Sequence, residues 1–388
     1  MPSKSPTIWP RVIGQHRVKN ILLSALRVER LPHAYVFVGN EGVGKDAMAL
    51  ELARVIQCER KQDEACGACA SCLKMETLQH PDVKFVVPLP VGKNEQSDDG
   101  PLDKVPASEV QAIQEQYRLK AHNPYHRVSI PRANIIKINS IRQVRRESAM
   151  RSLYGGKKIF IVSNAEEMGD EAANTLLKTL EEPPGDTLLI LTTSRPEMLL
   201  PTILSRCQFV RLDPLTEEDI AGALVAREGV ERAQATLVAR LASGSYVHAL
   251  ELLQANVAEL RQDVVQFIRT ALASNFLNLS QHIDKLAATK DREFIVRFLT
   301  LMLVWFRDAF VLLLGADVIN LDQQEDLKKF TARFPSADLN EVMAAVDHAI
   351  SLIGKNGYIP LTLLQLTVKM RRSILESRQL SIPTASNA

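Results

Sequence analysis

The architecture of the N-terminal half follows from one stretch, Tyr35-Val-Phe-Val38-Gly39-Asn-Glu-Gly-Val-Gly44-Lys45-Asp46. A short run of β-forming residues leads into a glycine-rich turn, and helical periodicity follows over Asp46–Gln57. In this strand–turn–helix context, backbone N–H groups of the turn can surround phosphates, and Lys45 can reach the terminal phosphate. The stretch therefore predicts a phosphate-binding loop.

The last position of this loop departs from the phosphate-binding pattern. A functional loop requires Ser or Thr after the lysine, because its hydroxyl holds Mg²⁺, whereas this chain has Asp46. A carboxylate there repels phosphates and competes for the N–H groups at the helix start. We therefore predict a degenerate nucleotide site at Gly39, Gly44, Lys45 and Asp46, in which Asp46 stabilises a helix start. ATP binding is disfavoured less strongly than hydrolysis, because Lys45 is retained.

A second predicted strand ends in Ser163-Asn164. ATP hydrolysis needs an acidic pair at such a strand end, since one carboxylate supports Mg²⁺ and the other activates water. Neither Ser163 nor Asn164 has a side-chain pKa suited to a general base. Glu166 and Glu167 lie further along, where we expect solvated charges. The sequence therefore predicts no autonomous ATP hydrolysis.

Four of the five cysteines form the cluster Cys58-x7-Cys66-x2-Cys69-x2-Cys72. Four thiolates suit a closed tetrahedral zinc site, in which the metal contributes folding energy rather than catalysis. The Gly67-Ala pair leaves room for the tight turn of a Cys-x-x-Cys knuckle. We predict structural Zn²⁺ here. The alternative is four reduced, unbound thiols.

The rest of the first half alternates strands and helices, which predicts a parallel sheet covered by helices. Between two of the strands, Val91–Pro106 lacks periodicity and is predicted to be a loop, with a composition that also permits disorder. The expected elements are a helix over Val18–Arg27, strands over Tyr35–Val38, Lys84–Leu89, Ile135–Ile138, Lys158–Val162 and Thr187–Leu191, and a helix over Asp170–Leu180 that Pro183 and Pro184 end.

After Pro214 the β signal disappears, so the fold class is α/β followed by all-α. Leu215–Leu253 predicts a small helical domain, and Val257 to about Arg378 predicts a larger bundle with a polar tail. The most apolar stretch, Phe294–Leu314, is interrupted by two arginines and an aspartate. We interpret it as a buried bundle helix rather than a membrane span.

Bulk composition narrows the class of protein. A chain of 388 residues exceeds one compact core, so two or three domains are expected. The net charge of +2 gives no global attraction to nucleic acid, and DNA contact would need a local patch. The N-terminal residues show no signal-peptide pattern, and the cysteines are not spread as in a disulfide framework. We expect a cytoplasmic protein.

A set of further motifs carries a family resemblance. The motifs are Val12-Ile-Gly-Gln15, His33-Ala-Tyr35, the cysteine cluster, Ala173-Asn-Thr-Leu-Leu-Lys-Thr-Leu-Glu-Glu-Pro-Pro184 and Leu200-Pro-Thr-Ile-Leu-Ser-Arg-Cys207. With these motifs the sequence resembles the bacterial clamp-loader AAA+ subunits of DNA polymerase III, and the Leu-Leu-Lys-Thr-Leu-Glu-Glu-Pro-Pro run is highly specific.

Within this family, three departures favour the non-hydrolysing delta prime kind over the ATP-hydrolysing gamma/tau kind. They are Asp46, the Ser163-Asn164 pair, and Val247, which stands where the ATPase subunits carry a sensing Arg. The resemblance implies a role in DNA replication as part of a DNA polymerase holoenzyme, with no ATPase or polymerase chemistry expected of this chain alone.

The resemblance also gives Ser205-Arg206-Cys207 a role, because this tripeptide carries the family's arginine finger. An arginine at a domain rim can reach a neighbour's nucleotide site and stabilise transition-state charge in trans. Without the family context, Arg206 would be an ordinary surface arginine. The implied partners are gamma/tau and delta subunits in a ring of five, which opens the sliding clamp and places it on primed DNA. We expect no membrane partner.

The same resemblance predicts three domains and a tail. They are an AAA+ core over residues 1–212 with a zinc module over 58–72 and an insertion over about 90–134, a helical lid over 213–255, a helical collar over 256–380 and a polar tail over 381–388. The sequence assigns no role to the insertion.

Other interpretations stay open. The chain could be a divergent gamma/tau-like ATPase in which Asp46 or Glu166 replaces the missing groups, or a zinc-dependent interaction protein. A basic run could contact DNA, but we favour a solvated helix face because Tyr154 is its one interleaved aromatic residue. The run comprises Arg142, Arg145, Arg146, Arg151, Lys157 and Lys158.

Overall fold

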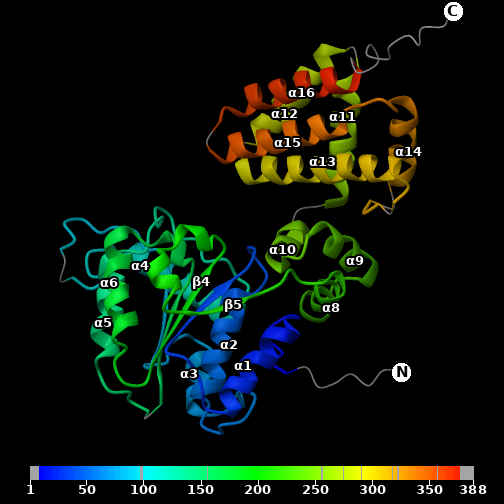
Figure 1. Ribbon diagram of the computed structural model, residues 1–388. Coiled ribbons are helices and arrows are strands. Elements are labelled where there is room, and N and C mark those ends of the chain that lie inside the picture. The colour runs from blue at the N-terminus through cyan, green and yellow to red at the C-terminus, as the bar shows by residue number, and fades with distance from the viewer. Residues whose placement is uncertain are drawn as a thin grey trace, which may run out of the picture. The chain divides into compact units, whose positions relative to one another are not determined.

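The computed structural model describes residues 8–96, 99–154, 156–254, 257–273, 275–289, 291–316, 318–320, 323–355 and 357–375. The chain divides into two compact units, residues 1–249 and 250–388. The first unit holds a sheet with helices packed on it, and the second is built from helices (Figure 1). The predicted class, α/β followed by all-α, is confirmed.

The sheet of the first unit is parallel, with its strands in the order β2-β3-β4-β1-β5. All residues of β1 and β4 are buried, as expected for central parallel strands covered on both faces. The loop that follows β1 leaves the sheet at its carboxyl edge. It lies between the ends of β4 and β5, because β1 pairs with both of these strands. The strands are β1 Ala34–Val38, β2 Val83–Val86, β3 Lys158–Val162, β4 Thr187–Thr193 and β5 Gln208–Arg211.

Helices of the first unit cover the sheet, and three more helices follow the last strand in the sequence. One apolar core joins β1, β3 and β4 to the inward faces of α5, α6 and α7. The helices are α1 His16–Arg27, α2 Lys45–Gln57, α3 Ala70–Met75, α4 Ala107–His122, α5 Ile138–Ser148, α6 Asp170–Glu181, α7 Pro201–Leu204, α8 Glu217–Glu228 and α9 Arg232–Leu241, with α10 Tyr246–Gln254 crossing into the second unit.

One predicted strand is wrong. Within Ile135–Ile138, Ile136 makes an isolated bridge to Met168, and Ile138 is the first residue of α5. Ile136 is fully buried. The apolar run in the sequence therefore indicated burial, but a run of four residues is too short to distinguish a buried strand from other buried backbone.

The insertion is more ordered than its composition suggested. Among its described residues, the loop is held by Glu95, which accepts from Lys137 Nζ at 2.9 Å and from Asn139 Nδ2 at 2.9 Å. The insertion then forms α4, which the sequence did not predict. Its far end returns to the phosphate loop, where Lys120 pairs with Asp46.

The second unit is a bundle in which α15 packs against both α13 and α16 (Figure 1). Aromatic rings fill its core, with the Trp305 and Phe330 centroids 5.0 Å apart. The helices are α11 Val257–Leu272, α12 Phe276–Ala288, α13 Arg292–Leu313, α14 Gln324–Arg333, α15 Leu339–Gly354 and α16 Ile359–Leu375. The predicted polar tail, 381–388, lies outside the described residues.

One of the charged residues of α13, Asp308, is accommodated inside the bundle. Asp308 is fully buried and accepts from the backbone N–H of Asn320 at 2.6 Å and from its side chain at 2.8 Å. Arg261 in turn donates to Asn320 Oδ1 at 2.6 Å. Across the described parts of the chain, no helix combines the length and apolarity needed to cross a bilayer.

Candidate functional site

The glycine-rich loop joins β1 to α2 as predicted. Gly44 is the N-cap of α2 with φ of 98°, a left-handed conformation that glycine adopts without strain. Lys45 Nζ donates to Gly39 O at 2.9 Å, to Asn40 O at 2.9 Å and to Ser194 Oγ at 2.7 Å. Because an ammonium has three donors, this lysine is saturated by the protein itself. Burial lowers its pKa.

Asp46 does not cap α2 through its side chain. Its carboxylate instead accepts from Thr192 Oγ1 at 2.7 Å and from Ser163 Oγ at 2.9 Å, and it pairs with Lys120 Nζ at 2.8 Å. Burial alone would raise the pKa of Asp46. The ammonium of Lys120 and the hydrogen bonds from Lys120, Thr192 and Ser163 outweigh burial and lower the pKa below its ordinary value of 3.8.

The structure brings part of the predicted degenerate pair to the loop. Ser163 is buried at the end of β3 and faces Asp46. Asn164 is exposed and adopts a left-handed conformation with φ of 52°, and its backbone N–H donates to Thr192 Oγ1 at 3.4 Å. A serine hydroxyl and an exposed amide supply no carboxylate for Mg²⁺ or water at these two positions.

The expectation for Glu166 is wrong. Its side chain is only 4% exposed, and Oε1 accepts from the backbone N–H of Ser194 at 3.1 Å. Ser194 is also the residue that Lys45 contacts, so Glu166 lies beside the loop lysine. The 3-10 turn Ala165–Glu167 folds this carboxylate back toward the end of β4, a turn that the linear spacing did not reveal.

The sequence also missed Lys120 and Tyr125, which come from the insertion. The Lys120 side chain is 5% exposed and reaches Asp46. The Tyr125 hydroxyl lies 2.7 Å from the place a Cβ on Gly44 would occupy. The insertion is polar and contains other lysines and another tyrosine. No sequence pattern therefore distinguishes Lys120 and Tyr125 from these residues.

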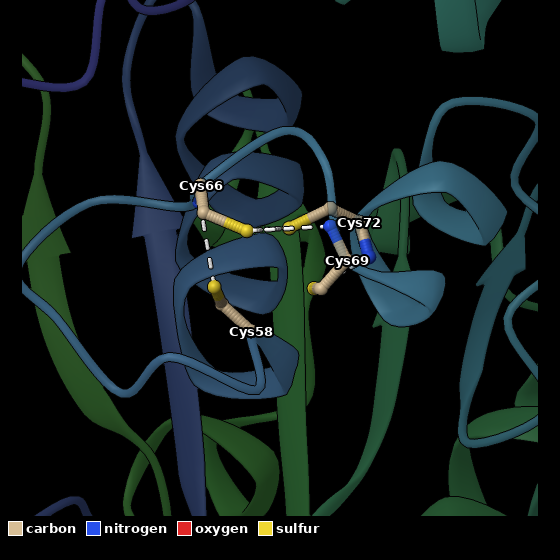
Figure 2. A group of neighbouring side chains, drawn as sticks. All are labelled: Cys58, Cys66, Cys69 and Cys72. Carbon is tan, nitrogen blue, oxygen red and sulfur yellow. Dashed lines mark hydrogen bonds between the residues drawn. The ribbon is translucent and has the colours of Figure 1, made fainter.

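The four clustered cysteines meet at the carboxyl end of α2 and the start of α3. Their sulfurs point toward one another (Figure 2) and all lie within 4.8 Å of each other. The Sγ atoms of Cys66 and Cys72 are 3.9 Å apart. Gly67 has φ of 69°, so the predicted tight turn between Cys66 and Cys69 is confirmed.

These residues fit a metal ion. Tetrahedral zinc with Zn–S of about 2.3 Å sets sulfur atoms about 3.8 Å apart, close to the spacing found here. Backbone N–H groups donate to three of the sulfurs, at 3.3 Å for Cys58 and 3.4 Å for Cys66 and Cys69. Those from Ala68 and Cys69 lower the pKa of Cys66 to about 6. Such bonds stabilise the thiolate form that a metal requires.

His80 is not part of this cluster. It is buried, its Nδ1 accepts from the backbone N–H of Asp82 at 3.2 Å, and its ring lies 5.4 Å from that of Tyr154. These contacts hold His80 within the fold.

Arg206 lies between α7 and β5 at the surface of the first unit. It donates to Thr202 O at 3.0 Å and pairs with Glu181 Oε1 at 3.0 Å, with 36% of its side chain exposed. The neighbouring Ser205 hydroxyl donates to Thr202 O, and burial raises the pKa of Cys207 to about 12. Among the described residues, the Arg206 guanidinium has one ion pair, to the half-exposed Glu181, and its charge stays accessible to solvent.

A parallel sheet in this order, with a glycine-rich loop after β1, defines an AAA+ P-loop-type domain. A sequence model of the family described as DNA polymerase III, delta subunit, matches residues 14–216. The chain belongs to this family.

The chain is similar to subunits delta' of DNA polymerase III from two bacteria. It is 32% identical to that of Bacillus subtilis (strain 168) over 65% of this chain and 63% of the relative. It is 29% identical to that of Escherichia coli (strain K12) over 65% of this chain and 64% of the relative. The similarity therefore spans somewhat less than two thirds of each relative's length.

Among solved structures, the chain is similar to a DNA polymerase III gamma subunit-related protein from Thermotoga maritima. The alignment covers 91% of this chain and 99% of that chain, with 16% identity and a TM-score of 0.41.

Proposed function

We propose that this chain is a non-hydrolysing, delta prime-like subunit of the DNA polymerase III clamp loader, a scaffold that donates Arg206 in trans to an adjacent ATPase subunit. The supporting observation is the state of its own nucleotide site. Asp46 is bound to Lys120, Ser163 and Thr192, Lys45 is saturated, and Ser163-Asn164 supplies no acid pair. Hydrolysis therefore has to occur on a neighbour.

The proposed partners are gamma/tau and delta subunits, with the sliding clamp and primed DNA met through the assembly in the cytoplasm. In this arrangement residues 1–212, 213–255 and 256–380 are core, lid and collar. An apolar face of α16 supports docking of the collar: Leu361, Leu364 and Val368 are 62%, 49% and 61% exposed and recur at helical spacing. Exposed apolar residues on one helix face are typical of protein interfaces.

Direct DNA contact by the basic run is not needed for this role. Lys158 Nζ donates to Glu147 O at 2.7 Å, and Lys157 pairs with Asp186 at 3.5 Å. These two lysines are thus engaged within the chain, which leaves less of the run's charge for DNA.

The cysteine cluster is proposed to hold structural Zn²⁺ through Cys58, Cys66, Cys69 and Cys72. Bound zinc would fix the excursion after α2 to the start of α3. Four thiolates would fill all four positions of a tetrahedral zinc ion, which leaves no open coordination position and argues against catalysis by the metal.

The trans role is tested by reconstituting the complex from purified subunits with Arg206→Ala. Losing an arginine finger slows hydrolysis at the affected site by about 10³-fold or more, so the complex should lose that site's share of DNA-stimulated ATP turnover while co-eluting normally. Arg211→Ala, at an exposed position of the neighbouring strand, is the control. Unchanged turnover in the Arg206→Ala complex would remove the proposed role.

A divergent gamma/tau-like ATPase is the second candidate, and Glu166 is the observation that favours it. This buried carboxylate lies beside Lys45, and its Oε2 atom has no hydrogen-bond partner among the described residues. Magnesium-dependent phosphate release by the isolated chain, abolished by Lys45→Ala or Glu166→Gln, would establish this alternative and replace the scaffold role.

A further inference from the structure

The end of the insertion lies directly on the phosphate loop. Lys120 pairs with Asp46, and the Tyr125 hydroxyl packs over Gly44. Arg127 pairs with Glu41 at 3.2 Å. Residues 120–127, which we call the insertion plug, therefore contact the loop at Glu41 and Gly44 and the first turn of α2 at Asp46.

Lys120 stands where a nucleotide-bound Mg²⁺ would be held. In a nucleotide site that binds Mg²⁺, the metal lies between the residue after the loop lysine and the polar residue that follows the strand corresponding to β3 here. Here those residues are Asp46 and Ser163. Asp46 Oδ2 accepts from Ser163 Oγ at 2.9 Å and lies 2.8 Å from Lys120 Nζ. Lys120 also donates to His126 O at 3.0 Å. A tethered ammonium thus replaces a diffusible cation.

Tyr125 fills the space between the phosphate loop, the N-terminal segment and α10. Its hydroxyl accepts from the backbone N–H of Ile13 at 2.8 Å. Its ring meets that of Tyr246 edge-on, with centroids 5.1 Å apart. Arg227 lies over both rings, 5.5 Å and 5.8 Å from their centroids. Tyr125 is only 3% exposed, so its side chain is a packed core element and not a loose cover.

The plug is also fixed from behind. Asn123 Oδ1 accepts from the backbone N–H of Tyr125 at 3.0 Å, and His126 Nε2 lies 2.9 Å from Gln116 Oε1. Arg11 donates to Ala121 O. These bonds hold residues 120–126 in one conformation without help from a ligand.

The far side of the loop is closed as well. The backbone N–H of Tyr246 donates to Gly42 O at 3.1 Å, and a Cβ on Gly42 would lie 2.0 Å from Ser245 Oγ. The loop therefore touches residues 245–246 directly, and phosphates could enter only if these residues separated.

We propose that the insertion plug is an internal occupant of the nucleotide site: Lys120 and Tyr125 exclude Mg²⁺–nucleoside triphosphate and hold residues 213–249 closed on the sheet without ligand. The proposal deepens the scaffold function proposed above, since it explains how a rigid platform forms without ATP. It assigns the insertion a role inside the site. It also predicts that restoring the missing loop hydroxyl will not restore binding.

The test measures binding of N-methylanthraniloyl-ATP with Mg²⁺ to the full chain by fluorescence anisotropy. Asp46→Thr restores the loop motif but leaves Tyr125 in place, and should bind no better than the unmodified chain. Asp46→Thr combined with Lys120→Ala and Tyr125→Ala should bind at least about tenfold more tightly. Asp46→Thr with Arg118→Ala and His122→Ala, two exposed α4 positions, is the matched control and should behave as Asp46→Thr alone.

Two outcomes would overturn the plug. One is saturable binding by Asp46→Thr alone, because the retained tyrosine would then not exclude nucleotide. The other is a folded triple variant, with circular dichroism like that of the unmodified chain, that binds no better than Asp46→Thr.

A measurement on the unmodified chain covers the case in which the triple variant does not fold. Hydrogen exchange of amides 120–126 should be as slow as that of β1 and β4, and 1 mM ATP with Mg²⁺, about the KM range of many enzymes, should not change it. Fast exchange of this segment would refute a seated plug. Neither readout involves Arg206 or partner subunits, so the scaffold function and the plug can fail separately.

Discussion

The ion pair between Asp46 and Lys120 offers the sharpest test of how the degenerate site is held together. The two side chains are 19% and 5% exposed and their charged atoms lie 2.8 Å apart. Lys120→Met removes the charge and keeps most of the apolar stem. Asp46→Asn keeps the shape and removes the opposite charge. The double variant removes both, so the three together form a double-mutant cycle.

The expected magnitudes follow from this geometry. At an effective dielectric of about 20, charges this close attract by about 6 kcal/mol, and desolvation offsets much of that. Removing one partner leaves an uncompensated buried charge and costs about 3–5 kcal/mol. Asp46 retains Thr192 and Ser163 as donors, so Lys120→Met should fall near about 3 kcal/mol. The double variant should cost about 2 kcal/mol less than the sum of the single variants.

The assay is urea unfolding of the full chain, followed by near-ultraviolet circular dichroism. The two units can unfold separately. The measurements would therefore use a Trp305→Phe background, in which Trp9 of the first unit is the one tryptophan that contributes to the signal. Additive costs, with a coupling energy near zero, would show that the pair contributes no interaction energy and would refute the reasoning.

The pH dependence of the same variants has a definite sign. The folded pKa of Asp46 lies below its ordinary value of 3.8, so its charged form is favoured by folding. Its contribution is present above the unfolded pKa and is lost as the pH falls from about 4 through the lowered folded pKa. Unfolding free energy measured from pH 6 to pH 3 should therefore fall less steeply for Asp46→Asn than for the unmodified chain. Equal slopes would contradict the shift.

Three further changes have outcomes set by single contacts. Cys72→Ser should abolish binding of one metal ion per chain, measured by elemental analysis, and lower the melting temperature, whereas Cys207→Ser should leave the metal content unchanged. Asn320→Ala removes the side-chain hydrogen bond that Asp308 Oδ2 accepts and the Oδ1 atom to which Arg261 donates, but keeps the backbone N–H bond to Asp308, and should destabilise the second unit by about 1–3 kcal/mol in urea unfolding. Gly42→Ala forces a side chain onto a φ of 77° and against a facing serine, and should cost the first unit about 1–3 kcal/mol by thermal unfolding.

Much of the fold could be predicted because its signals are local. β1, the loop and α2 follow one another within 24 residues (34–57), and each has its own residue pattern. The helix over Asp170–Glu181 ends at the expected proline pair. The strand predicted over Ile135–Ile138 failed because a buried isoleucine beside a helix start gives the same short apolar run as a strand.

The candidate site divides in the same way. The cysteine cluster is local in sequence, and its spacing alone brought four sulfurs to one place. The contacts of Asp46 are not local: Lys120, Ser163 and Thr192 lie 74, 117 and 146 residues further along the chain. Long-range pairing depends on the order of the strands and on where the insertion ends. The sequence pattern showed that the loop lacks its hydroxyl, but it could not show which group pairs with the carboxylate that stands in its place.

This difference changes what degeneration of the site means. A loop that had merely lost its metal ligands would carry an unpaired lysine and an unpaired aspartate, and each buried, uncompensated charge would cost several kcal/mol. Neither is unpaired here, since Lys45 has three protein acceptors and Asp46 has three protein donors. Both charged groups are thus hydrogen-bonded within the chain, and Asp46 is in addition paired with the ammonium of Lys120. A site whose electrostatics are already complete has little to gain from ATP, so its closed form is the ground state of the isolated protein.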